Sequence, residues 1–173
     1  MKLYNKTKCP KELLYPLLVA AGESVGARTS RTVVKVTQGR GSRIKGVAYN
    51  YRTVYTHHLH RKRQKYKGTL RTLGRSIFCE GYFEITLPAK GTHRGQDEID
   101  KARTFYEVAQ HEWAHIRDYQ ERTRFEERRT PTGRRPRWKD RPIEIAACNR
   151  VEDARKMSNQ DDLILNLAIY LNE

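Results

Sequence analysis

The second half of the chain is organised around residues 97–122, which read DEIDKARTFYEVAQHEWAHIRDYQER. Apolar side chains recur in this stretch at steps of three and four residues, the spacing of one face of an α-helix. These apolar positions are Ile99, Ala102, Tyr106, Ala109, Trp113, Ile116 and Tyr119. The pattern predicts a single long helix that buries this face and leaves the opposite face polar.

The segments before this helix predict one short helix followed by strands. Residues 11–21 place leucines and alanine on one helical face. The β-branched residues of 31–37 predict a strand, and residues 44–58 predict a second, longer one. A third predicted strand covers residues 80–87 and stops at Pro88, because proline cannot donate to a sheet.

The segments after the long helix predict two more helices. Residues 142–157 and 161–171 have helical spacing, and residues 123–141 predict a loop. Strands first and helices afterwards argue for an α+β fold with a small antiparallel or mixed sheet, not for alternating βαβ units. We expect a basic, β-rich part at 1–96 and a helical part at 97–173, which together form one compact domain.

Positive charge is concentrated in the first half of the chain. The net charge is +15, and residues 24–79 hold fourteen Lys and Arg but no Asp or Glu. Such a segment is typical of proteins that bind a polyanion, most often nucleic acid, although charge of this kind can also serve solubility alone. The predicted nucleic-acid contacts are the densest run of these cations: Arg61, Lys62, Arg63, Lys65 and Lys67.

Cysteine content and hydropathy bear on the compartment. Three cysteines without a CxxC pair do not make a disulfide framework. No apolar run reaches the length needed to cross a bilayer. Both features favour a cytoplasmic protein without a membrane partner, and neither fixes an oligomeric state.

Candidate chemistry is concentrated at His111, Glu112 and His115, which form an HExxH motif in the middle of the long predicted helix. Residues four apart on a helix lie one turn above one another, so both imidazoles can bind one metal ion, and zinc favours nitrogen ligands. Glu112 lies beside His111, where it can take a proton from a water molecule that the metal activates. The spacing therefore predicts a zinc site with Glu112 as general base, in preference to a polar helix face with two unrelated histidines.

A catalytic zinc needs a third protein ligand, and no histidine follows His115. The remaining ligand types are a carboxylate or the thiol of Cys148. Glu144 is the preferred candidate because it lies in the first turn of the next predicted helix, after a loop long enough to fold back. The alternatives are Glu152 and Asp153.

The motif HEWAH at 111–115, followed by RPIEIAA at 141–147, resembles the small Glu-zincin metallopeptidases, which have a zincin-like fold. The resemblance covers about 97–157 and the strand before it. It implies that a Glu on the following helix, here Glu144, completes the site of one Zn²⁺ ion. The chain lacks the NExxSD form of the third-ligand motif that larger relatives carry.

The resemblance also implies a sheet whose edge strand borders the active-site cleft. The backbone of the substrate would then add to that edge as one more strand. Residues 82–87, YFEITL, match this edge strand by position. The implied substrate-binding residues are Tyr82, Phe83, Glu84, Ile85 and Thr86.

Together these features predict a zinc metallopeptidase that hydrolyses protein or peptide substrates, with the basic half directing it to proteins bound to nucleic acid. The alternative is a nucleic-acid-associated binding or regulatory protein on a catalytically idle zincin scaffold. The intact Glu112 favours the enzyme, because a scaffold needs only the metal ligands.

Overall fold

The computed structural model describes residues 1–30, 32–39, 44–50, 81–89, 97–123, 125, 136–157 and 160–172. In chain order its elements are β1 Lys2–Lys6, α1 Lys11–Ser24, β2 Thr32–Gln38, β3 Gly46–Asn50, β4 Gly81–Leu87, α4 Glu98–Glu121, the short 3-10 helix η1 Trp138–Asp140, α5 Pro142–Met157 and α6 Asp161–Asn172. Each predicted helix is present to within three residues of its predicted bounds. The strand predicted at 44–58 can be followed only to Asn50, and the rest of it lies outside the described residues. No helix in the described ranges is both long enough and apolar enough to cross a membrane.

The strands form one mixed sheet in the order β1-β2-β4-β3. β1 pairs with β2 in parallel, β2 pairs with β4 in parallel, and β3 pairs with β4 in the antiparallel direction. The predicted α+β class with a small mixed sheet is therefore confirmed at this level. The sequence did not predict β1, because its five residues, KLYNK, include no β-branched side chain.

β4 is an interior strand, so the prediction that residues 82–87 form the edge of the sheet is wrong. β2 pairs with β4 over Gly81–Leu87 and β3 pairs with it over Gly81–Ile85, so both sides of this stretch are taken and no free backbone edge remains there for a substrate strand. Its side chains are consistent with this position, because Tyr82 and Phe83 point to opposite faces of the sheet and both are buried. The edge strand that contacts the helix of the HExxH motif is β3.

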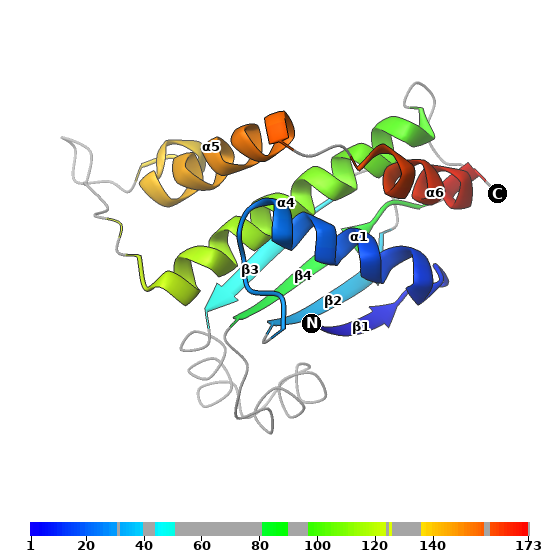
Figure 1. The fold of residues 1–173 in the computed structure, drawn as a ribbon, viewed down its shortest axis with the longest axis horizontal. Coiled ribbons are helices and arrows are strands. Elements are labelled where there is room, and N and C mark those ends of the chain that lie inside the picture. The colour runs from blue at the N-terminus through cyan, green and yellow to red at the C-terminus, as the bar shows by residue number, and fades with distance from the viewer. Residues whose placement is uncertain are drawn as a thin grey trace.

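The helices pack around α4, which lies against β3 and β4 and also contacts α1, α5 and α6 (Figure 1). α4 begins after Asp97, whose side chain accepts a hydrogen bond from the Ile99 N–H at 3.3 Å. It ends at Glu121, and the next residue, Arg122, adopts the left-handed conformation common just after helix ends. This central position means that side chains on different faces of α4 meet the sheet, α1 and α5.

Trp113, in the middle of the HExxH motif, anchors α4 in the core. Its side chain is fully buried, its indole N–H donates to the carbonyl of Leu18 on α1 at 2.8 Å, and its ring meets Phe83 of β4 edge-on. Gly22 permits the close approach of α1, because a Cβ there would lie 2.9 Å from the indole. Trp113 thereby fixes the rotation of α4 about its axis, which sets the direction in which the other motif residues project.

Candidate metal centre and active site

Three side chains with metal-binding atoms meet between α4 and α5. His111 and His115 project from consecutive turns of α4, and Glu144 projects from the first turn of α5. The two Nε2 atoms lie 3.1 Å apart, and Glu144 Oε2 lies 3.1 Å from His111 Nε2 and 3.2 Å from His115 Nε2. The structure therefore brings together the three residues that the sequence singled out, and within the described ranges they form the one such group found.

The three ligand atoms fit a tetrahedral zinc ion. Zinc with bonds of about 2.0–2.1 Å keeps tetrahedral ligand atoms about 3.3–3.4 Å apart, close to the observed triangle of 3.1–3.2 Å. Hydrogen bonds among the three atoms alone would satisfy them poorly, because each Nε2 carries at most one proton and cannot donate it to both neighbouring atoms. One cation facing all three atoms would satisfy them together.

Burial shapes the protonation of the ligands. Burial, the charge of His111 and the nearby Arg150 guanidinium lower the pKa of His115 to about 4. This histidine is therefore neutral at neutral pH, the form that binds metal. Burial raises the pKa of Glu144, and the adjoining His111 pulls it in the opposite direction.

Glu112 lies beside this triangle and is almost fully buried, with 5% of its surface exposed. Burial and the neighbouring charge of Glu144 raise the pKa of Glu112 to about 8, and a hydrogen bond from the backbone N–H of Ala48 opposes that shift. Ala48 belongs to the edge strand β3, so the candidate base is held by a strand as well as by its own helix. A carboxylic acid with a pKa moved toward neutrality in a cleft is a candidate for proton transfer.

Gly46, the first residue of β3, makes room for Glu112. A Cβ at this position would lie 2.5 Å from Glu112 Cγ and 2.7 Å from its Cδ, well inside ordinary van der Waals contact. A glycine inside a strand often marks a close approach of another group, and here that group is the candidate base. Gly46 is therefore part of the site, although the sequence analysis did not single it out.

A cleft of about 430 Å³ opens beside His111 and Glu112. Four apolar residues from different parts of the chain line one wall of the cleft: Ile44, Val108, Trp138 and Val151. Trp138 on η1 is 58% exposed, and its ring centroid lies 5.8 Å from that of His111. The cleft can therefore receive an apolar group directly beside the candidate metal ligands.

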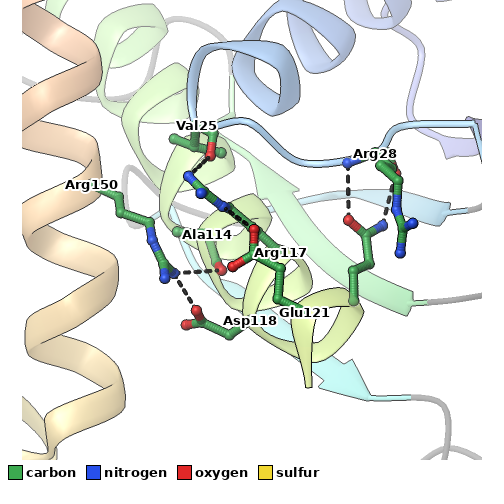
Figure 2. A network of polar contacts seen from close by, with 8 residues as sticks. Val25, Arg28, Ala114, Arg117, Asp118, Glu121 and Arg150 are labelled. Carbon is green, nitrogen blue, oxygen red and sulfur yellow. Dashed lines mark hydrogen bonds and ion pairs between the residues drawn. The ribbon is translucent and has the colours of Figure 1, made fainter. Parts of the chain in front are cut away.

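Two arginines tie α4 to its neighbours, as Figure 2 shows. Arg150 of α5 forms an ion pair with the buried carboxylate of Asp118 and donates to the Ala114 carbonyl at 3.4 Å. Arg117 of α4 donates to the Val25 carbonyl at 3.0 Å, on another side of the helix. The contacts of Arg150 hold α5, the helix that carries Glu144, against α4, and the contact of Arg117 holds the chain after α1.

The other candidate ligands lie elsewhere. Cys148 Sγ is 3.9 Å from Nδ1 of His111, the ring nitrogen that does not belong to the ligand triangle. Glu152 lines the cleft, and Asp153 pairs with Lys156 at 3.6 Å on the surface of α5. None of the three joins the ligand group. The predicted nucleic-acid contacts all lie outside the described residues: Arg61, Lys62, Arg63, Lys65 and Lys67.

Comparison with known proteins adds no relative. A scan against protein-family models, a search of curated proteins and a search of solved structures each found no match to this chain. The resemblance to Glu-zincins therefore rests on the motif, and the functional argument rests on the geometry of the site.

Proposed function

We propose that this chain is a zinc-dependent peptidase in which His111, His115 and Glu144 hold the metal and Glu112 is the general base. The observation that carries the proposal is the ligand triangle of 3.1–3.2 Å with the buried Glu112 carboxyl next to it. Three protein ligands leave a fourth position for water or substrate, which is the arrangement of a catalytic zinc and not of a structural one. The Glu-zincin resemblance of HEWAH and RPIEIAA supports the same chemistry.

The proposed role of each group follows from its position in the site. Zinc bound at the triangle would polarise the scissile carbonyl and make a water molecule acidic enough to lose a proton near neutral pH. Glu112 accepts that proton and delivers it to the leaving amine. A divalent cation would also offset the charge of Glu144, and so bring the pKa of Glu112 down from about 8 toward a carboxylate that can accept protons.

The substrate backbone is proposed to pair with β3. β3 forms the edge of the sheet beside α4, and it holds the candidate base through the Ala48 N–H. An extended peptide added to this edge would place its carbonyl groups next to Glu112 and the metal. Its side chains could then enter the apolar cleft beside Trp138. The role that the resemblance implied for β4 passes to β3, because both sides of β4 are already paired.

A second candidate function rests on the acid-free segment at 24–79, whose fourteen cations favour a polyanionic partner. We propose that this segment binds nucleic acid weakly and with little sequence selectivity. It would then direct the peptidase to proteins on nucleic acid, or serve a binding protein that uses the zinc site for architecture. The buried, metal-adjacent Glu112 favours the peptidase, because architecture needs no proton acceptor.

The test is the variant Glu112→Gln in a protein-cleavage assay, with the zinc content measured in the same samples. Glutamine keeps the shape but accepts no proton, so cleavage should fall by about 100- to 10,000-fold while zinc remains bound. Glu121→Gln is the matched control, since Glu121 ends the same helix and pairs with Arg117 away from the cleft. Equal cleavage by the wild type and Glu112→Gln at equal zinc content would reject the proposed mechanism.

A further inference from the structure

The contact between Asp118 and Arg150 joins the two helices that carry the proposed metal ligands. Asp118 follows His115 by three residues on α4, and Arg150 follows Glu144 by six residues on α5. At a rise of about 1.5 Å per residue, these positions lie roughly 5 Å and 9 Å along their helices from the ligands. The Arg150 guanidinium reaches both the Asp118 carboxylate and the Ala114 carbonyl, as Figure 2 shows.

The burial of Asp118 makes this contact hard to replace. Its side chain is 1% exposed, whereas that of Arg150 is 23% exposed. A buried carboxylate without its counter-charge is strongly unfavourable, so the pair resists any movement of α5 that separates the two groups. A more exposed ion pair also joins these helices: Arg155 with Glu107 at 2.7 Å, whose side chains are 53% and 30% exposed. Solvent screens that pair, and it constrains the helices less.

The apolar packing of α5 leaves its position along α4 weakly determined. The buried face of α5 consists largely of small residues, with Ala147 and Ala154 on either side of Val151. Small side chains allow a close approach but offer shallow ridges, which interlock less than large ones. A directional polar contact is then needed to fix how far α5 slides and rotates against α4, and Arg150 supplies one.

We propose that the Asp118–Arg150 ion pair is a positioning clamp, which holds Glu144 against His111 and His115 and thereby sets the affinity and geometry of the metal site. The inference rests on the proposed metal site and deepens it. Asp118 and Arg150 do not touch the metal or the substrate. They act through the placement of Glu144, so their loss changes metal binding and not the identity of the ligands.

The experiment compares zinc affinity and the Co²⁺ absorption spectrum among variants. Arg150→Met and Asp118→Asn should lower zinc affinity by about 10- to 100-fold, the usual effect of losing a residue that supports metal ligands. They should also alter the Co²⁺ bands, because the ligand geometry changes. Arg150→Lys keeps the charge but loses the forked geometry, so its affinity should lie between that of Arg150→Met and the wild type. The Arg150→Met/Asp118→Asn double variant should lose no more affinity than the worse single variant, because both changes break one contact.

Two variants serve as matched controls. Arg117→Met removes an arginine that also bonds to a backbone carbonyl, but on a side of α4 that does not meet α5. Arg155→Met removes the exposed ion pair from α5 itself. Both should keep wild-type zinc affinity and the wild-type Co²⁺ spectrum.

The possible outcomes distinguish a failure of the clamp proposal from a failure of the proposed metal site. If the wild type binds neither zinc nor Co²⁺, the proposed function fails, and the clamp fails with it. If the wild type binds metal and the folded Arg150→Met and Asp118→Asn proteins bind it equally well, with an unchanged spectrum, the clamp alone is overturned. Should Arg150→Met not fold, by circular dichroism of the metal-free protein, Arg150→Lys decides, and wild-type affinity and spectrum in that variant overturn the clamp.

Discussion

Gly46→Ala is a small change that should separate catalysis from metal binding. The added Cβ would lie 2.5 Å from Glu112 Cγ, whereas ordinary contact begins near 3.4 Å, so the two groups must separate by about 0.9 Å. Glu112 lies in a cleft-side position, while Gly46 is fixed by its pairing with β4, so we expect Glu112 to take most of this shift. A displacement of about 1 Å at a reacting group can lower the rate by roughly 100-fold.

Zinc binding should survive this change, because the new methyl group meets Glu112 and not the ligand triangle. We therefore expect kcat/KM for a protein substrate to fall by roughly 100-fold at unchanged zinc content. Overpacking should also lower the free energy of unfolding by about 1–3 kcal/mol.

Two control variants distinguish a displacement of Glu112 from a general effect of changing the sheet. Val47→Ala changes the next residue of β3, whose side chain is 48% exposed, and should leave the rate near that of the wild type. Gly81→Ala is the same substitution on β4, where the Cβ would meet the core side chain of Ile116 at 2.7 Å. It should lower stability without a comparable loss of rate. Wild-type kcat/KM in a folded, zinc-loaded Gly46→Ala protein would refute the placement of Glu112 against β3.

Two further predictions concern the third ligand and the basic segment. Glu144→Ala should weaken zinc binding far more than Glu152→Ala, measured by competition with a chelator, and the reverse order would show that the wrong carboxylate was chosen. The 173-residue chain should bind DNA or RNA at about 50 mM salt, with an affinity that falls steeply as the salt concentration rises, as measured by fluorescence anisotropy. If it does not bind at that salt concentration, the acid-free segment serves only solubility. Replacing five cations together should weaken that binding and flatten its salt dependence while zinc content stays the same: Arg61, Lys62, Arg63, Lys65 and Lys67.

The site could be predicted from sequence because its decisive relations are local. The spacing of His111 and His115 places both imidazoles on one helical face whatever the rest of the chain does. The carboxylate of Glu144 required one more inference, that the helix beginning at Pro142 packs against α4, and the structure has that contact. The motif and the helix bounds therefore carried most of the information about the ligand group.

The sheet was harder to predict because its strand order depends on pairings between distant segments. The stretch at 82–87 is compatible with an edge or a centre, and only its pairing with both β2 and β3 places it inside. β1 completes the sheet, although its polar residues give no strand pattern. The parallel pairing of β1 with β2 also forms a β-α-β unit that the order of predicted elements did not suggest.

The supporting residues were missed for a related physical reason. Gly46 matters because a backbone segment far along the chain from Glu112 comes within contact distance of it. A glycine at the start of a predicted strand was the available signal. Asp118 lies one helical turn after His115 on the same face, which could have identified it, but its partner Arg150 is defined only by the packing of α5.

The most direct test of the proposed metal centre is the zinc content of the purified protein and of its histidine variants. The ligand triangle predicts about one zinc per chain in the wild type, and little or none in His115→Ala or in the His111→Ala/His115→Ala double variant. Inductively coupled plasma mass spectrometry on protein exchanged into metal-free buffer measures this directly. A wild-type protein that neither retains nor takes up zinc, or a double variant that holds as much zinc as the wild type, would contradict the account.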